Sequence, residues 1–273
     1  MKYWLLEKLK NLPFIKKKAK AAPIQSTDEE DLAEQELWWG TFLIEEEQSR
    51  FFKIGQLVTC VDRFNHKWHI TTYHEGEQPF KTFAAQTSNT INLKPMLPDR
   101  ALLSLLDRPC YIPLGETLRV YISVPLWIQI SAGNPITILD EFATETLADT
   151  WFGKSTRAGE LCYNNPIHGS PRLEDLPQDS THAIIPVSIE NRTKGTNLLH
   201  ELKIPLDNLA LYSDKKNRLW TEDVHLCQED TNSLETLTVK NAPLPLSDLQ
   251  LVSPARVMIK PGLKNFFGSF MWE

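Results

Sequence analysis

Two charged residues that could do chemistry, Arg157 and Glu160, flank Gly159 in a segment that also contains Trp151 and Tyr163. An arginine guanidinium presents a planar fork of N–H donors that matches carboxylate and phosphate groups. This fork either binds an anionic ligand or forms an ion pair with Glu160 that fixes the loop. Trp151, Arg157, Glu160 and Tyr163 are therefore the candidate ligand-binding residues.

Other groups of reactive side chains predict little chemistry. The four cysteines are far apart, so the sequence lacks the spacing of a zinc site and predicts free thiols. On a strand, His69 would face away from His66 and His74, which does not favour a metal site. Nucleophile and phosphate-loop motifs are missing. We predict no catalytic residue, metal or cofactor, although a carbohydrate-active enzyme with distant carboxylates stays open.

Residues 1–20 combine apolar side chains at helical spacing with seven lysines and one glutamate, a net charge of +6. Charges interrupt the apolar run and most lysines follow it, unlike in a secretory signal or a membrane span. The pattern predicts a short amphipathic helix that docks on a membrane or a partner. A frayed terminus or a helix packed on the body is the alternative. The candidate docking residues are Trp4, Leu5, Leu9, Lys16, Lys17 and Lys18.

The charge distribution narrows the class of partner. Residues 28–47 contain nine acids and neither Lys nor Arg, whereas the whole chain has a net charge of -6. An acidic body without a basic stripe argues against a nucleic-acid binder. With 41% hydrophobic and 23% charged residues, the 273-residue chain has the composition of a folded globular protein.

From Trp38 onward, short apolar stretches alternate with turn signals and predict β-strands. Residues 118–130 alternate most clearly, but Pro125 cannot donate a ladder hydrogen bond, so an edge position, a bulge or two strands is expected. Residues 101–106 read as a helix or a strand, and residues 140–150 as irregular or one helical turn. The predicted fold is mainly β: two antiparallel β-sandwich-like domains and a short N-terminal amphipathic helix.

Residues 164–180 contain three prolines and two clusters of turn-forming residues, which favours a domain joint there. The predicted divisions are residues 1–36, a basic amphipathic segment with an acidic linker; residues 37–172, an N-terminal β domain; and residues 173–273, a C-terminal β domain.

Several segments carry a family resemblance. They are WGTF at 39–42, IGQL at 54–57, VYISVPLW at 120–127, DTWFGKSTRAGELCY at 149–163, IPVSIENR at 185–192, residues 209–212 and RLWT at 218–221. Together they resemble a family of uncharacterised prokaryotic proteins described as a domain of unknown function. Ala158 stands where relatives have an acidic residue. The resemblance implies a β-rich body without an established activity. Because some relatives are encoded near small-conductance mechanosensitive channels, it also implies a membrane-associated accessory role.

Together, these observations predict a non-enzymatic, all-β interaction or accessory protein. We expect it in the cytoplasm, peripheral at the inner membrane face, where residues 1–20 dock on the membrane surface or on a membrane protein. The alternative is a ligand-binding β-sandwich module for a carbohydrate or an anionic small molecule, with its site near residues 151–163. Eight tryptophans would suit sugar stacking, although core packing explains them equally. The partner's identity and the oligomeric state stay open.

Overall fold

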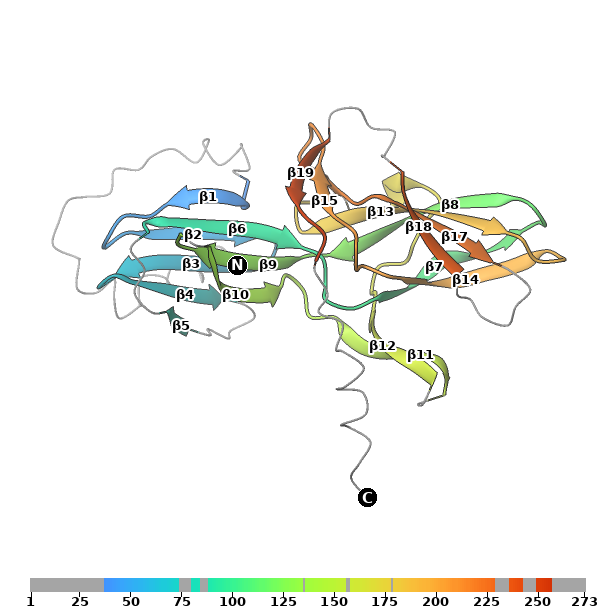
Figure 1. The fold of residues 1–273 in the computed structure, drawn as a ribbon, viewed down its shortest axis with the longest axis horizontal. Coiled ribbons are helices and arrows are strands. Elements are labelled where there is room, and N and C mark those ends of the chain that lie inside the picture. The colour runs from blue at the N-terminus through green and yellow to red at the C-terminus, as the bar shows by residue number, and fades with distance from the viewer. Residues whose placement is uncertain are drawn as a thin grey trace, which may run out of the picture. The chain divides into compact units, whose positions relative to one another are not determined.

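The computed structural model describes residues 37–73, 80–83, 88–134, 136–155, 158–177, 179–228, 236–242 and 249–256. Four sheets with antiparallel and mixed strand pairing account for most of these residues (Figure 1). Among them, the helical structure is the single 3-10 turn η2 (Leu173–Asp175). The mainly β prediction is confirmed, whereas the predicted N-terminal helix lies outside the described residues.

Two four-stranded sheets share one hydrophobic core. Val61, Ile70, Ile91 and Ile130 are examples of its buried residues, and they come from both sheets. Sheet 1, in the order β1-β6-β9-β10, comprises β1 (Gly40–Leu43), β6 (Thr90–Met96), β9 (Trp127–Ala132) and β10 (Thr137–Ala143). Sheet 2, in the order β2-β3-β4-β5, comprises β2 (Ser49–Ile54), β3 (Leu57–Phe64), β4 (Lys67–Tyr73) and β5 (Phe80–Phe83).

Sheet 2 is an antiparallel meander, as the short connections between its strands predict. Asn65 and His66 join β3 to β4 with φ angles of 52° and 57°. Two successive positive φ angles give a turn whose twist matches that of the flanking strands. Arg63 stands opposite Trp68 and Val61 opposite Ile70 across this hairpin.

Two further sheets contain parallel as well as antiparallel pairs. Strand β12 runs parallel to β7, and β13 runs parallel to β16 and β17, so the expectation of wholly antiparallel sheets is wrong here. Sheet 3, in the order β11-β12-β7-β14, comprises β7 (Leu102–Ile112), β11 (Ala148–Ser155), β12 (Ala158–Asn164) and β14 (Asn197–Ile204). Sheet 4 comprises β8 (Thr117–Pro125), β13 (His182–Asn191), β15 (Leu211–Ser213), β16 (Leu219–Trp220), β17 (Asp223–Gln228), β18 (Thr236–Ala242) and β19 (Gln250–Ser253).

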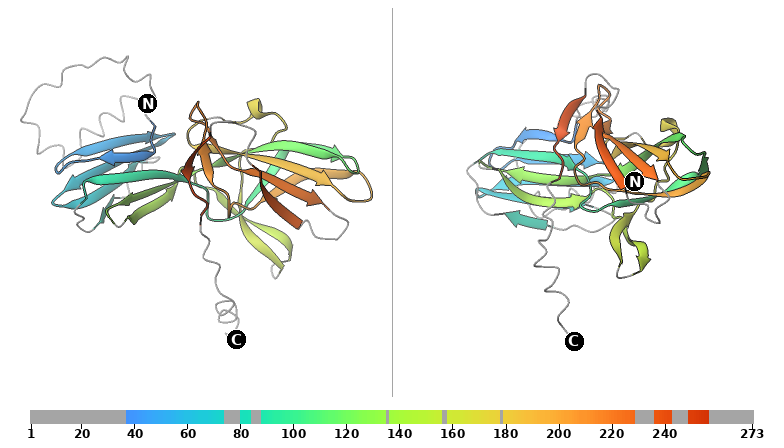
Figure 2. Two further views of the ribbon diagram at one scale, coloured as in Figure 1. Left: turned by 45° about the horizontal axis from the view of Figure 1, so that its top comes forward. Right: turned by 45° about the vertical axis from the view of Figure 1, so that its right-hand side comes forward.

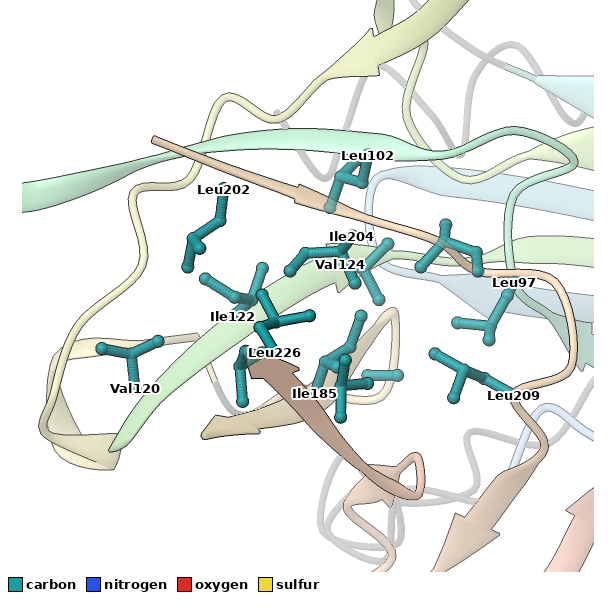
Figure 3. Packing of buried hydrophobic residues seen from close by; sticks show 14 of the residues in the cluster. Leu97, Leu102, Val120, Ile122, Val124, Ile185, Leu202, Ile204, Leu209 and Leu226 are labelled. Carbon is teal, nitrogen blue, oxygen red and sulfur yellow. The ribbon is translucent and has the colours of Figure 1, made fainter. Parts of the chain in front are cut away.

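Strand β8 supplies one side of the core that sheets 3 and 4 share. Val120, Ile122 and Val124 alternate along it and are fully buried. Figure 3 shows them among Leu202 of β14 and Leu226 of β17, in the cluster to which all five belong. The apolar residues that alternate along 118–130 and predicted a strand therefore form a buried face of that strand.

The proline in that stretch separates two strands, which confirms one of the three alternatives. Strand β8 ends at Pro125 in sheet 4, and β9 begins at Trp127 in sheet 1. Between them, the Leu126 N–H donates to the carbonyl of Thr181 at 2.9 Å, and its carbonyl accepts from the amide and hydroxyl of Thr144. The break lets the chain pass from one sheet to the other with the backbone groups of Leu126 satisfied.

Two local predictions are settled by the strand assignment. Of the two alternatives for residues 101–106, the strand is confirmed, because strand β7 begins at Leu102. The prediction of irregular structure or a helical turn at 140–150 holds only for residues 144–147 and is wrong on either side of them, because β10 continues to Ala143 and β11 starts at Ala148. Both are end strands of their sheets, and an edge position tolerates the polar, acidic residues that argued against strands here.

The segment predicted to join two domains is built into the body. Gly169 exchanges backbone hydrogen bonds with β7, and Ser170 does so with Tyr121 of β8. A Cβ on Gly169 would stand 2.3 Å from Cδ1 of Ile122, so only glycine fits this approach. Strands before and after residue 173 share sheets 3 and 4; the predicted domain divisions stay predictions.

Candidate functional site

The segment with the candidate ligand-binding residues forms the antiparallel hairpin β11–β12. It stands out from the neighbouring strands in both Figure 1 and Figure 2. Trp151 lies opposite Leu161, and their exposed fractions are 44% and 40%. Directly opposed residues share a face of a sheet, so the hairpin presents an apolar pair to solvent.

The indole of Trp151 lies over Gly159 on the opposite strand. A Cβ at Gly159 would stand 2.4 Å from Nε1 of Trp151 and 2.8 Å from the carbonyl oxygen of Phe152. An aromatic ring that covers a glycine on a neighbouring strand stabilises that strand position. The combination of tryptophan and glycine is thus a packing requirement of the hairpin.

Glu160 lies on the opposite face of the hairpin from Trp151, because it pairs with the next residue, Phe152. Its carboxylate forms an ion pair with Lys203 of β14. The Lys203 ammonium also lies 5.5 Å from the centroid of the Phe152 ring. These contacts tie the hairpin to the far strand of sheet 3.

Tyr163 anchors the base of the hairpin. It is buried, and its hydroxyl donates to Oδ1 of Asp99 at 2.8 Å. The guanidinium of Arg100 lies 5.1 Å from the ring centroid and donates to Asp149 of β11 at 2.9 Å. Burial, with the hydrogen bond to Asp99, raises the pKa of Tyr163 to about 12.

The three predicted ligand-binding residues that the structure describes therefore occupy three different settings. Trp151 and Glu160 lie on opposite faces, Tyr163 is buried at the base, and Arg157 lies outside the described residues. The structure does not bring the three described side chains to one point. The role of Arg157 stays a prediction.

All four cysteines are free thiols, as predicted. Burial is the main cause that raises the pKa of both Cys60 and Cys162, and a nearby acid, Asp62 or Glu160 respectively, adds to it. A raised pKa disfavours the thiolate, which is the nucleophilic form. These two cysteines are core residues.

A cavity of about 270 Å³ opens between sheets 1 and 2, where the sequence predicted no site. The Lys81 ammonium of β5 meets both carboxylate oxygens of Asp140 of β10 at its edge, at 2.7 and 2.9 Å. These two residues are 59 positions apart, so no sequence spacing could have revealed the pair. The cavity is lined by Leu57, Ile70, Thr72, Lys81, Asp140, Phe142, Ala143, Thr144 and Thr146.

A polar cluster marks the start of β13. Oδ1 of Asp179 accepts from the amide and hydroxyl of Thr181 and lies 2.8 Å from Nδ1 of His182. The hydrogen bond from His182 is the main cause that lowers the pKa of Asp179. On its other side, Nε2 of the buried His182 lies 3.6 Å from Oε1 of Glu145. The cluster fixes the chain next to Leu126.

Comparison with known proteins identifies the family of the chain. A family model described as protein of unknown function (DUF432) matches residues 38–271. The chain belongs to this family. A comparison with curated proteins gives no match, and a comparison with solved structures gives none either.

The DUF432 match contains the β11–β12 hairpin and every described residue that lines the cavity. It starts at Trp38, where the described strands begin, and leaves residues 1–37 outside. Trp4, Leu5, Leu9 and the lysine cluster 16–18 lie both outside the match and outside the described residues. Their docking role stays a prediction.

The acidic stretch 28–47 extends into the DUF432 match. Three of its nine acids, residues 45–47, follow β1. Glu45 accepts a hydrogen bond from the side-chain amide of Asn89 at 3.1 Å, and Glu46 accepts one from the backbone N–H of His66 at 3.0 Å. Glu46 also lies 3.5 Å from the Arg63 guanidinium. These glutamates hold the loop after β1, so the acidic stretch is partly structural.

In the described ranges, no group of three His, Cys, Asp or Glu side chains is arranged to hold a metal ion. His69 stacks on Phe80 with 5.5 Å between ring centroids, and His66 is exposed beside Glu46; His74 is outside these ranges. No helix within the described part has the length and hydropathy of a membrane span.

Proposed function

We propose that this protein is a non-enzymatic, all-β interaction protein that docks peripherally on a membrane surface or a membrane protein through residues 1–20. The observation that carries the proposal is the contrast between the +6 charge of these residues and the acidic remainder of the chain. Each lysine near an anionic surface contributes about 1 kcal/mol. Seven lysines beside Trp4, Leu5 and Leu9 are sufficient for reversible binding.

The location proposed is the cytoplasmic face of the membrane. Anionic lipids give that leaflet a negative surface potential, which attracts basic segments. The acidic stretch 28–47 follows the basic one and is repelled by the same surface, so the attraction is confined to residues 1–20.

The hairpin β11–β12 supports the interaction role. Exposed aromatic residues are enriched at protein interfaces, and Trp151 with Leu161 forms such a surface pair. For the body, we propose that sheets 1 and 2, and likewise sheets 3 and 4, are layers of β-sandwich-like units, because each pair of sheets contributes side chains to one core.

A flotation assay tests the docking proposal. The full chain should float with anionic liposomes, and a chain without residues 1–22 should stay at the bottom of the gradient. Replacement of Lys16, Lys17 and Lys18 by glutamine should reduce flotation, whereas the same change at the matched lysines Lys53, Lys67 and Lys94 of the body should not.

Flotation with native membranes separates the two kinds of target. If the full chain floats with native membranes but not with protein-free anionic liposomes, the target is a membrane protein. Equal flotation of the full chain and the deletion variant in both preparations would contradict the proposal.

A further inference from the structure

We propose that the cavity between sheets 1 and 2 binds a free α-amino acid with an apolar side chain, held as its zwitterion. The described residues that line this site include none from the β11–β12 hairpin. It adds a ligand to the proposed interaction protein and does not depend on that role.

The interior of the cavity fits an apolar group. Leu57 and Ile70 come from sheet 2 and are buried, while Phe142 and Ala143 come from the end of β10. The volume of about 270 Å³ equals the share of roughly nine waters at about 30 Å³ each. A leucine or phenylalanine side chain can fill such a space, and its burial would be favourable in proportion to the apolar area removed from water.

The edge of the cavity carries one cation and one anion. Lys81 is half exposed, whereas the side chain of Asp140 is 11% exposed. Oδ1 of Asp140 also accepts from the Glu141 N–H at 2.9 Å, which fixes the orientation of the carboxylate. A lysine ammonium has three N–H donors, so Lys81 can contact Asp140 and a second acceptor together.

This charge pair selects among ligands. The ammonium of an amino acid matches Asp140, and its carboxylate matches Lys81, so both charges of the ligand find opposite partners. A ligand with only a carboxylate would be opposed by Asp140, and one with only an ammonium by Lys81. Leaving one charge unmatched is unfavourable, most of all at Asp140, whose side chain is 11% exposed, and the zwitterion avoids this.

The remaining polar residues at the cavity, Thr72, Thr144 and Thr146, are uncharged. The hydroxyl of Thr144 already donates to the carbonyl of Leu126 at 2.7 Å. Among the lining residues that the structure describes, therefore, no further charge is present to pair with an acidic or basic side chain of the ligand. The site should prefer leucine, isoleucine or phenylalanine to lysine or glutamate.

The opening lies where two sheet edges meet. Lys81 belongs to β5, the end strand of sheet 2, and Asp140 belongs to β10, the end strand of sheet 1. Their ion pair links these edges across the cavity. A ligand can therefore enter with its apolar side chain first and keep its two charged groups beside Lys81 and Asp140, without separating any paired strands.

The test is a titration of the full chain, followed by methyl NMR and by thermal shift. L-leucine should move the methyl resonances of Leu57, Ile70 and Ala143 and raise the melting temperature. Leucinamide lacks the carboxylate and 4-methylvalerate lacks the ammonium, so the affinity for each should be lower than that for leucine by a factor of about ten or more. L-lysine should not bind in the cavity.

Variants separate the site from general effects. Lys81→Met and Asp140→Asn should each reduce leucine binding about tenfold, whereas the matched changes Lys67→Met and Asp207→Asn, at residues that do not line the cavity, should leave it unchanged. Ala143→Leu keeps both charges and fills the cavity, so it should abolish binding even if Asp140→Asn fails to fold.

Three results would overturn the inference: no response to any of the three apolar amino acids at millimolar concentration, equal binding of 4-methylvalerate, or leucine binding that survives Ala143→Leu. None of them bears on membrane docking, because flotation is measured without added amino acid.

Discussion

Two hairpins of this protein share their local chemistry and differ in what surrounds them. Hairpins β3–β4 and β11–β12 are both antiparallel, and each carries a tryptophan. Trp68 on β4 is 1% exposed, whereas Trp151 on β11 is 44% exposed. Strands β3 and β4 lie between β2 and β5 and contribute to the core shared with sheet 1, but β11 ends sheet 3. Burial here is decided by neighbours far away in the sequence.

Trp68 therefore contributes to the packing of the whole fold, whereas Trp151 contributes to the packing of its own hairpin. Trp68 joins a core built from two sheets, while Trp151 covers a single glycine of its own hairpin. An apolar surface maintained outside the core is available to a partner.

Replacement of each tryptophan by alanine tests the difference between the two hairpins most directly. Trp68→Ala should lower the free energy of unfolding by about 3–5 kcal/mol, because it leaves a cavity in a packed core. Trp151→Ala should cost about 1 kcal/mol or less, the usual size of a cross-strand contact. Urea denaturation measures both, and similar losses would show that the hairpin belongs to the core.

Adding a methyl group at two glycines should give the next largest effect. Gly169→Ala places a Cβ against Ile122 in the core and should cost about 1–3 kcal/mol. Gly159→Ala places one against the half-exposed Trp151, which can move, and 2.8 Å from the backbone carbonyl oxygen of Phe152, which cannot move easily, so the loss should be of similar size. In the double variant with Trp151→Ala, only the part of the cost that comes from Trp151 should disappear; strict additivity in denaturation would disprove the contact with Trp151.

Tyr163→Phe probes the base of the hairpin. Loss of the hydrogen bond to Asp99 should lower the free energy of unfolding by about 1 kcal/mol at neutral pH. Because the folded pKa is raised to about 12, this stabilisation is complete below the unfolded pKa of about 10 and is lost as pH rises through the folded pKa. The difference between the two proteins in denaturation should therefore narrow above pH 10. A constant difference up to pH 12 would contradict this origin.

The smallest effect is expected from Glu160→Gln, which removes the ion pair with Lys203. Since the Glu160 side chain is 52% exposed, the loss should be about 1 kcal/mol or less and should disappear at high salt. Thermal denaturation at low and high ionic strength measures it. A loss that persists in high salt would indicate that Lys203 holds the hairpin by packing on Phe152.

Sequence patterns predicted much of the strand structure and little of the pairing. Alternation located β8, and Pro125 marked its end because a proline lacks the N–H that a ladder needs. The sequence predicted a strand only up to Leu139 and missed the acidic second half of β10, since acidic residues are tolerated there by an edge position that only the sheet order reveals. The pairing of β8 with β13, and the meeting of Lys81 with Asp140, depend on long-range contacts without any local signal.

The candidate site shows the same limit. The sequence grouped Trp151, Glu160 and Tyr163 correctly in one segment, and each has a defined contact in the structure. It could not show that Trp151 and Glu160 face opposite ways, because this depends on the register of the hairpin, which a slip of one residue would reverse.

The pairing of β8 with β13 also bears on how the chain emerges from the ribosome. Strand β8 is complete once Pro125 has been made, yet its partner begins only at His182. In the interval, Val120, Ile122 and Val124 have neither β13 nor the Gly169–Ser170 bridge beside them. Nascent chains with such uncovered apolar strands are targets for chaperones and prone to aggregate. A chain that ends between these two points would contain β8 without the strand that covers it.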